Sequence, residues 1–431
     1  MPDVAIIGAG MAGLAAASRL ASRGVTVTVF ESAKLLGGRA RGIDYKGVML
    51  DNGQHIMLGA YRETLRLLKQ AEIDESQAFL RLPLQLHMQD IKHHPTISLY
   101  ANATLPAPLH ILAAFLFARG LTKNSRFAAI RLMLWAQLHR FQLVQDMPLS
   151  DFLTQRKQTQ QLITAIWEPL CLAALNTPLH EASAQVFLNV LRDSFARKKG
   201  DSDLLLPRAD LSALLSQPLA DWLSGQGTSI VRQGVKKIET STSGFNVFTD
   251  TQILSFSHVI LACGPHQLTH IELPDTLANA LPNFDYQPIT TVYLQLDESL
   301  QLPRPMTGLV NSVSQWVFDR GLMCGQKGLL AVVISADNTA SGMPNDALAE
   351  RVIAELQLAF PDLGKPLWHK VITEKFATFA CKASLKRPDS QTCIKNLYLA
   401  GDYVAGDYPA TIEGAVRSGI AAADYILKLG H

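Results

Sequence analysis

Three glycines near the N-terminus constrain the fold of this chain more than any other feature. Gly8, Gly10 and Gly13 stand between a charge-free apolar run at 4–7 and an Ala- and Leu-rich stretch at 14–23. An apolar run without alternation is typical of a parallel strand covered on both faces, and Ala and Leu favour a helix. The pattern predicts a strand, a tight turn and a helix that opens at the glycines.

A second β-branched run and an acid complete this pattern. Residues 25–30 predict another strand, and Glu31 follows it, eighteen positions after Gly13. Gly8 would permit the turn, Gly10 would let the backbone approach a pyrophosphate, and Gly13 would let helix and strand pack closely. The helix N-terminus would offer N–H groups to phosphates, and Glu31 would accept from ribose hydroxyls. We predict a dinucleotide site; the alternative is a βαβ unit whose glycines serve packing alone.

A second group of glycines favours FAD over NAD. The segment after Glu31 contains Gly37, Gly38, Arg39 and Arg41. These glycines would bring backbone N–H groups to the pyrophosphate, and Arg39 would add a donor fork. A simple NAD dehydrogenase does not need this segment, so FAD is the predicted cofactor. The alternative is a turn followed by surface arginines.

Composition places the chain among globular proteins and excludes several classes. It has 431 residues, 48% of them apolar, and a net charge of +2. The length predicts two or three domains, and the small net charge gives no electrostatic case for nucleic acid. Five cysteines without a CxxC pair favour reduced thiols in a cytosolic compartment over disulfides or a metal site. No apolar run reaches 18 residues, so we expect no transmembrane helix.

Further apolar strands predicted at 258–263 and 397–401 make the nucleotide-binding part discontinuous. The expected fold class is α/β, with a Rossmann-type FAD-binding domain and an inserted α+β substrate domain. The predicted FAD-binding domain comprises residues 1–80, 205–285 and 391–431, and the substrate domain comprises 81–204 and 286–390.

The stretch Pro108–Ala118 is the most apolar part of the inserted domain, with one histidine and no charge. It is too short to span a bilayer. A buried core helix is the favoured interpretation. The alternative is a helix in a membrane interface, with Phe115 and Phe117 inserted and the following basic residues near headgroups.

The C-terminal segment carries a second cofactor signal. A strand ends at Gly401 and Asp402, and the Asp402 carboxylate is placed to bond a ribityl or pyrophosphate-side hydroxyl. Thr411 then opens a helix whose first N–H groups, near Ile412 and Glu413, would face the flavin pyrimidine and stabilise negative charge in the reduced cofactor. The alternative is an ordinary strand–turn–helix.

Together these motifs resemble the phytoene desaturase and flavin amine oxidase superfamily, and more narrowly the FAD-dependent hydroxysqualene dehydroxylases of hopanoid biosynthesis. The narrower resemblance rests on five blocks spread over nearly the whole chain. They are DNGQHIMLGAY (51–61), WEPLCLAALNTP (167–178), QVFLNVLRDS (185–194), SDLLLPRADLSALL (202–215) and PATIEGAVRSG (409–419). The inner blocks are not shared with amine oxidases in general.

The resemblance implies an activity and a set of cofactor residues. The activity would be the reductive removal of a hydroxyl group from hydroxysqualene, giving squalene. Val235 would hold the adenine through its backbone. The expected FAD-binding residues are Gly8, Gly10, Met11, Ala12, Gly13, Glu31, Gly38, Arg39, Val235, Gly401, Asp402, Thr411 and Ile412.

Such a reaction needs a hydride from reduced flavin and an acid that protonates the departing oxygen. His55 is the first candidate, because its unperturbed pKa lies near neutrality; a histidine in a polar hairpin more often bonds backbone or cofactor. Glu168 and Asp193 are further candidates. Glu168 precedes Pro169 and so fits a helix boundary equally well, and Asp193 follows Arg192 and fits a local ion pair.

Three other functions share the same frame: an oxidative carotenoid or phytoene-type desaturase, an amine oxidase, and a non-catalytic FAD-bound scaffold. The expected partners are an apolar triterpene alcohol, a membrane surface, upstream squalene-pathway enzymes and a separate flavin reductant, because no second Rossmann motif is evident. The expected location is cytoplasmic, peripheral to the inner face of the plasma membrane.

Overall fold

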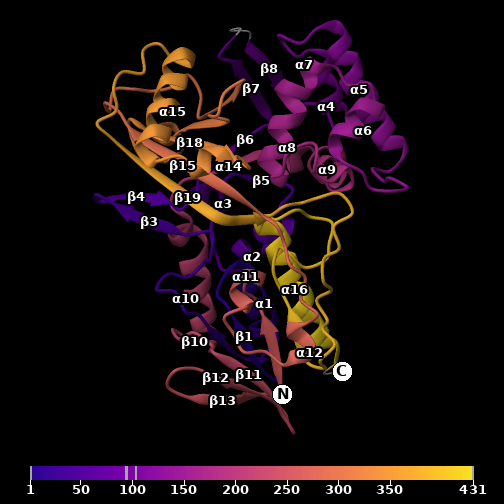
Figure 1. Ribbon diagram of the computed structural model, residues 1–431, viewed down its shortest axis with the longest axis vertical. Coiled ribbons are helices and arrows are strands. Elements are labelled where there is room, and N and C mark those ends of the chain that lie inside the picture. Colours follow the sequence, from indigo (N-terminus) through magenta and orange to yellow (C-terminus); the bar gives the residue numbers. More distant parts are fainter. Residues whose placement is uncertain (1, 93–95, 102–103, 430–431) are drawn as a thin grey trace.

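A parallel sheet built from distant parts of the sequence forms the lower half of the molecule (Figure 1). The computed structural model describes residues 2–92, 96–101 and 104–429. The sheet runs in the order β10 (Ser229–Val231), β2 (Thr26–Phe30), β1 (Asp3–Ile7), β14 (His258–Leu261) and β20 (Leu397–Leu399). All four strand pairs are parallel. The α/β class with a discontinuous nucleotide-binding sheet is confirmed.

Two helices with glycine-mediated contacts cover this sheet. Helix α1 (Met11–Ala21) follows β1 directly, and α16 (Ile412–Leu429) packs along it (Figure 1). A Cβ added at Gly419 would stand 2.1 Å from the carbonyl oxygen of Ala12, so only glycine allows the two backbones to approach this closely. This contact brings the C-terminal helix against the helix that opens at the glycine turn.

A three-stranded antiparallel sheet closes the lower end. Its strands are β11 (Lys237–Ser241), β12 (Gly244–Phe248) and β13 (Ile253–Phe256). The remaining helices of the lower half are α2 (Arg62–Gln70), α3 (Glu75–Ala78), α10 (Gln217–Gly225), α11 (Pro265–Leu268) and α12 (Asp275–Ala278).

A seven-stranded mixed sheet organises the upper half. It runs in the order β19 (Trp368–Phe379), β15 (Tyr286–Gln295), β18 (Leu329–Ser335), β17 (Trp316–Asp319), β16 (Met306–Val310), β7 (Gln85–Asp90) and β8 (Thr96–Tyr100). Helix α15 (Asn345–Ala359) covers one face, where Val352 and Leu356 join the buried strand residues Val292 and Val332. The short helices α13 (Arg320–Cys324) and α14 (Asn338–Gly342) pack against the strands of this sheet.

A helical part lies beside this sheet at the upper right of Figure 1. It consists of α4 (Leu109–Leu116), α5 (Lys123–Leu138), α6 (Leu149–Gln155), α7 (Gln160–Leu162), α8 (Glu168–Leu175) and α9 (Ala184–Leu191). Among the described residues no helix has both the length and the apolar character needed to cross a bilayer.

Two small sheets join the halves. The hairpin of β3 (Gly42–Tyr45) and β4 (Val48–Asp51) leads into the DNGQH segment. Strands β5 (Met57–Leu58) and β6 (Phe79–Leu82) both pair with β9 (Leu204–Pro207). The boundaries predicted after residues 80 and 204 therefore fall inside strands, because the two predicted domains share this sheet.

The contact at Gly419 predicts an unusual response to substitution. Alanine in a helix interior normally stabilises by about 1 kcal/mol relative to glycine. We expect Gly419→Ala to lower the free energy of unfolding instead, by about 1–3 kcal/mol, because its Cβ overlaps the Ala12 carbonyl. Urea unfolding measures the change. Gly225→Ala is the control, since a Cβ there meets nothing within 4 Å, and a stabilised Gly419→Ala chain would contradict the packing argument.

Candidate cofactor and active site

The glycine turn has one open position, at Gly10. A Cβ at Gly13 would stand 1.9 Å from the carbonyl oxygen of Gly8, and one at Gly8 would stand 3.0 Å from that of Ala262. Gly8 also has a φ of +107°, which favours glycine. A Cβ at Gly10 would meet nothing within 4 Å. The outer glycines thus serve packing, and Gly10 leaves the space that a ligand's phosphates need.

The Glu31 carboxylate reaches this turn from the end of β2. Its Oε2 accepts a hydrogen bond from the backbone N–H of Ala9 at 2.8 Å, and its Oε1 accepts from that of Ala33 at 2.8 Å. A carboxylate has about four acceptor positions. Each oxygen therefore keeps capacity for a ribose hydroxyl, and the position fits the predicted role.

The second glycine loop lies against the first. The backbone N–H of Gly37 donates to the carbonyl of Ala9 at 2.9 Å. Gly38 has a φ of +61°, and a Cβ there would stand 3.4 Å from the Cα of Gly10. Two glycine loops therefore face one another at the N-terminus of α1, which begins at Met11. Because the loops are in contact, this arrangement fits a pyrophosphate that lies along both of them at the start of α1.

An ion pair connects the N-terminal loop with the C-terminal motif. Arg39 Nη2 donates to Asp402 Oδ1 at 2.7 Å, and Nη1 donates to the Ala377 carbonyl at 2.7 Å. Burial lowers the pKa of Arg39, but the hydrogen bond and charge of Asp402, with the nearby Glu374 and Tyr286, raise it by more in total, so the guanidinium stays charged. The preceding Gly401 donates its N–H to Ser418 Oγ of α16 at 2.8 Å.

A narrow pocket adjoins this pair. Its lining residues are Arg39, Gly264, Pro265, His266, Tyr286, Phe379, Asp402 and Tyr403. The Tyr403 hydroxyl is buried and has no hydrogen-bond partner within the described part of the chain. A polar ligand group would satisfy it, so the residues present fit a large cofactor with polar and aromatic parts.

The start of α16 agrees with the helix predicted to open at Thr411. Thr411 Oγ1 accepts from the N–H of Gly414 at 3.1 Å, and the helix begins at Ile412. The Glu413 side chain is fully buried and accepts from the backbone N–H of Thr64 at 2.9 Å. Its carboxylate therefore caps α2 and is committed to that helix.

Val235 lies just before β11, which begins at Lys237. It is buried, and the neighbouring Gly234 stands next to Ser32. The backbone N–H of Glu31 also donates to the carbonyl of Val231, at the end of β10, at 3.0 Å. The segment thus runs beside the proposed ribose acid, where an adenine contact remains a prediction.

His55 lies in the segment that follows β4, and its Nδ1 stands 2.6 Å from the carbonyl oxygen of Gly53. Burial lowers the pKa of His55, and the charge of Arg39 lowers it further. At neutral pH the ring is uncharged, with the Nδ1 proton directed at Gly53 and with Nε2 lacking a hydrogen-bond partner among the described residues. A role as proton donor therefore requires that Nε2 first take up a proton.

Asp193 and Glu168, the two carboxyl candidates for the acid, do not fit that role. An acid in this site must be buried and must hold a proton at neutral pH. Asp193 pairs with Arg192 at 2.7 Å and with Arg197 at 3.1 Å. Burial raises the pKa of Asp193, but hydrogen bonds and charges led by Arg192 hold it below its ordinary value. Asp193 is a carboxylate at neutral pH, which corrects its interpretation as an acid. Desolvation raises the pKa of Glu168, yet its side chain is exposed, which argues against a role in a site that excludes water.

A buried polar and charged cluster that no sequence motif indicated lies beside the DNGQH segment. Arg320 Nη1 donates to Gln54 Oε1 at 2.7 Å and lies 3.6 Å from Asp51 Oδ2. Asp51 Oδ1 accepts from the N–H of Leu211 at 2.8 Å. Burial raises the pKa of Asp51 to about 6, although Arg320 lowers it in part. The cluster holds the segment that carries His55 against both halves of the molecule.

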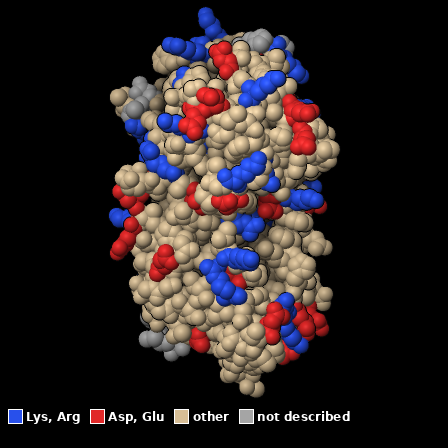
Figure 2. Space-filling model, turned by 90° about the vertical axis from the view of Figure 1, so that its left-hand side faces the viewer, with Lys and Arg blue, Asp and Glu red and all other residues tan. Residues whose placement is uncertain are grey.

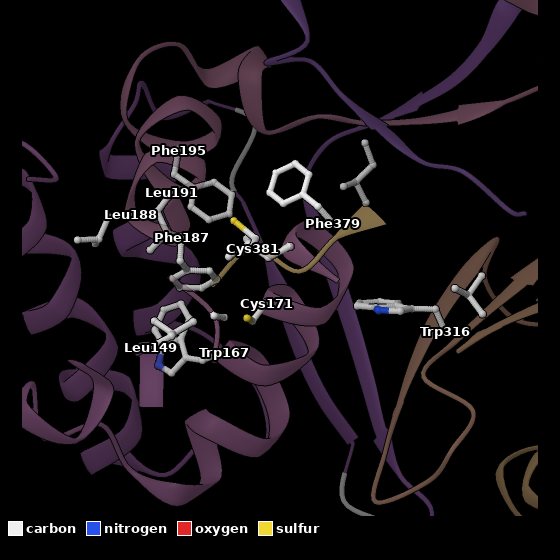
Figure 3. Close-up of a cluster of buried hydrophobic side chains, with 14 of the residues drawn as sticks. Leu149, Trp167, Cys171, Phe187, Leu188, Leu191, Phe195, Trp316, Phe379 and Cys381 are labelled. Carbon is white, nitrogen blue, oxygen red and sulfur yellow. The ribbon is translucent and has the colours of Figure 1, made fainter. Parts of the chain in front are cut away.

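An aromatic cluster fills the region between the helical part and the upper sheet (Figure 3). Trp167 and Phe187 lie together at 6.3 Å between ring centroids, and Phe379 projects from the end of β19. Phe115 is buried against Trp167 at 5.7 Å. Phe115 therefore belongs to the core, which agrees with the favoured interpretation of a core helix and contradicts the alternative in which it inserts into a membrane. Phe117 is 75% exposed.

A family model described as flavin containing amine oxidoreductase matches residues 11–427. The chain belongs to this family. Its cofactor is FAD, and the residues described above fit that cofactor at the glycine turn, at Glu31 and at the Arg39–Asp402 pair. The chain is an FAD-dependent oxidoreductase.

Curated relatives cover the chain almost completely. Hydroxysqualene dehydroxylase of Zymomonas mobilis is 28% identical, with 99% of both chains covered. That of Rhodopseudomonas palustris is 29% identical, also over 99% of both chains. Zeta-carotene desaturase of Arabidopsis thaliana is 26% identical over 99% of this chain and 86% of its own length.

Solved structures confirm the fold. A putrescine oxidase triple mutant has a TM-score of 0.74 at 17% identity and covers 99% of both chains. A putative protoporphyrinogen oxidase from Exiguobacterium has a TM-score of 0.72 at 16% identity, covering 100% of this chain and 99% of its own. Both have the same overall fold as this chain.

Glu31→Gln should weaken FAD binding. The Glu31 carboxylate accepts hydrogen bonds from two backbone N–H groups, one on each oxygen. Glutamine keeps one acceptor oxygen, but its amide N–H₂ group would face the second backbone donor. We expect an affinity loss of roughly tenfold or more. Titration of the apoprotein with FAD measures it. Glu350→Gln, at an exposed position on α15, is the control, and equal affinities of both variants would contradict the assignment.

Asp51 should give a recognisable pH dependence of stability. Its pKa of about 6 lies above the ordinary 3.8, so the folded chain holds this proton more tightly. Its contribution is therefore complete below pH 4 and is lost as the pH rises through 6, a change of about 3 kcal/mol. The free energy of unfolding of Asp51→Asn relative to the natural chain should rise by that amount between pH 4 and 7. A constant difference in urea unfolding would contradict this.

Proposed function

We propose that the chain reductively removes the hydroxyl group of hydroxysqualene to give squalene, in hopanoid or triterpene biosynthesis. The similarity to two hydroxysqualene dehydroxylases over 99% of the chain carries this proposal. The apolar interior beside the Arg39–Asp402 pair supports it, because a triterpene alcohol offers almost no polar group to bind.

Reduced FAD supplies the hydride in this reaction. The chain's own residues hold the cofactor and shape the site. The two glycine loops and the first turn of α1 take the phosphates, Glu31 takes the ribose, and Arg39 with Asp402 holds the C-terminal motif in place. Aromatic and aliphatic walls exclude water and shield the positive charge that develops on the substrate carbon when the oxygen leaves.

His55 is the proposed group for protonation of that oxygen. It is only partly exposed, it lies in the segment held by the Asp51–Arg320 cluster, and its Nε2 is open. Asp193 is ionised and Glu168 is exposed, so neither serves as well.

The proposed partners follow from the substrate. A thirty-carbon alcohol partitions into lipid, so we propose that the chain works at the cytoplasmic face of a membrane, supplied by upstream squalene-pathway enzymes. The electrons come from a separate flavin reductant.

Oxidative desaturation is the second candidate, and the similarity to zeta-carotene desaturase motivates it. One anaerobic experiment distinguishes the two. Enzyme reduced with dithionite is mixed with hydroxysqualene in detergent, and the visible absorbance of oxidised flavin is followed. Reoxidation with one equivalent of squalene supports dehydroxylation. No reoxidation, with polyene formed from phytoene or squalene by oxidised enzyme, would assign the chain to the desaturases.

Replacement of His55 should separate chemistry from cofactor binding. We expect His55→Gln to retain FAD and to lose roughly 100-fold or more in single-turnover rate, as for loss of a general acid. In the natural enzyme the rate should rise as the pH falls through the lowered pKa of His55. Stopped-flow absorbance from pH 5 to 8 measures both effects. An unchanged rate and pH profile in the variant would remove His55 from the mechanism.

A further inference from the structure

The segment 91–145 differs in charge from the rest of the chain. It contains no Asp or Glu, but six Lys and Arg residues. The whole chain, by contrast, has 39 basic and 37 acidic residues and a net charge of only +2. On the face drawn in Figure 2 both signs of charge are interspersed. A run of this length without an acid is therefore a local property of the helical part around α4 and α5.

The same segment exposes most of the large apolar side chains found on the surface. Of the fourteen exposed large hydrophobic residues among those described, eight belong to it. They are Tyr100, Leu109, Leu116, Phe117, Phe127, Leu134, Leu138 and Val144. Single exposed apolar residues need no explanation, but a concentration in one segment marks an interaction surface.

Three of these residues lie on one outward face of helix α5. Phe127, Leu134 and Leu138 recur at spacings of seven and four, which places them on one side of the helix. Leu138 is 81% exposed and Phe127 is 61% exposed. The opposite side, with Ala129 and Leu132, is buried in the core. The helix is therefore apolar on both faces, and its outer face has no covering element in the described chain.

The end of α4 extends this face. Leu116 and Phe117 stand at its C-terminus, and Arg126 Nη1 donates to the carbonyl of Leu116 at 3.3 Å. This bond places the end of α4 beside the start of α5, next to Phe127. The exposed side chains of both helices thus form one surface, which we call the α4–α5 face (Leu116, Phe117, Phe127, Leu134 and Leu138).

Cations frame the α4–α5 face without acidic partners. Within the described chain, no ion pair with a carboxylate involves Arg119, Lys123, Arg126, Arg131 or Arg140. Arg131 is fixed by the carbonyls of Arg156 and Lys157, at 3.1 and 3.0 Å, so its charge is held beside the apolar stripe. Aromatic and aliphatic residues flanked by unpaired cations are the composition of a helix that lies in the surface of an anionic bilayer.

We propose that the α4–α5 face docks the enzyme on a bilayer that contains anionic phospholipid. Charge complementarity selects this occupant, because the segment 91–145 brings positive charge and exposed apolar side chains to the surface and contributes no carboxylate to it. This inference rests on the proposed function, because a substrate dissolved in lipid gives the docking its purpose. The α4 helix also reaches the aromatic cluster through Phe115, so the docked face lies over the apolar interior.

Vesicle co-sedimentation of the FAD-loaded enzyme tests the proposal. The vesicles contain phosphatidylcholine alone or with 30–40% phosphatidylglycerol, roughly the anionic fraction needed for a strong surface potential. The test variant is Phe127→Ser/Leu134→Ser/Leu138→Ser. The matched control is Ile253→Ser/Leu358→Ser/Leu367→Ser, which removes three equally exposed apolar side chains elsewhere. A third variant, Lys123→Gln/Arg140→Gln, removes charge alone.

We expect the natural enzyme and the control to bind the anionic vesicles, and the α5 variant to bind at least tenfold more weakly. The charge variant should lose the preference for anionic over neutral vesicles. All variants should retain FAD and turn over substrate presented in detergent, which separates docking from the proposed reaction. No binding by the natural enzyme, or an equal loss in the control, would overturn the proposal.

Discussion

The close approach of backbones at the glycine turn is the constraint on which the rest of the structure depends. Gly13 lets α1 lie against the end of β1, and Gly419 lets α16 lie against α1. Together these contacts bring α16, from the C-terminal end of the chain, against the first turn of α1. The cofactor site is therefore a consequence of packing that any side chain larger than hydrogen would prevent.

The buried cluster around Arg320, which holds the DNGQH segment in place, could not be predicted from local sequence patterns. The positions of Glu31 and the glycines were predictable because they all belong to one βαβ unit, in which the spacing along the sequence determines where each residue lies. Arg320 and Gln54 are separated by 266 positions, and no local pattern connects them. For Asp193 the sequence left an acid and a local ion pair with Arg192 open, and the structure shows the ion pair, with Arg197 as a second partner. Local motifs are thus readable, whereas tertiary electrostatics are not.

The apolar stretch near Pro108 illustrates the same limit. Hydropathy alone is consistent with either a core helix or an interfacial helix. The structure shows that neighbouring residues of this stretch differ in burial. Phe115 packs on Trp167, whereas Phe117, two positions later, is exposed. The longer apolar stripe on α5 leaves no amphipathic pattern in the sequence, because the apolar residues of this helix face both inward and outward.

The central claim is that this site delivers a hydride from flavin to a triterpene carbon. Its most direct test is a single turnover of the reduced enzyme with hydroxysqualene in D2O, with mass spectrometry of the product, because the transferable hydrogen of reduced flavin exchanges with solvent. We predict squalene with one deuterium at the carbon that carried the hydroxyl group. Squalene without deuterium, or a product with additional double bonds, would contradict the claim.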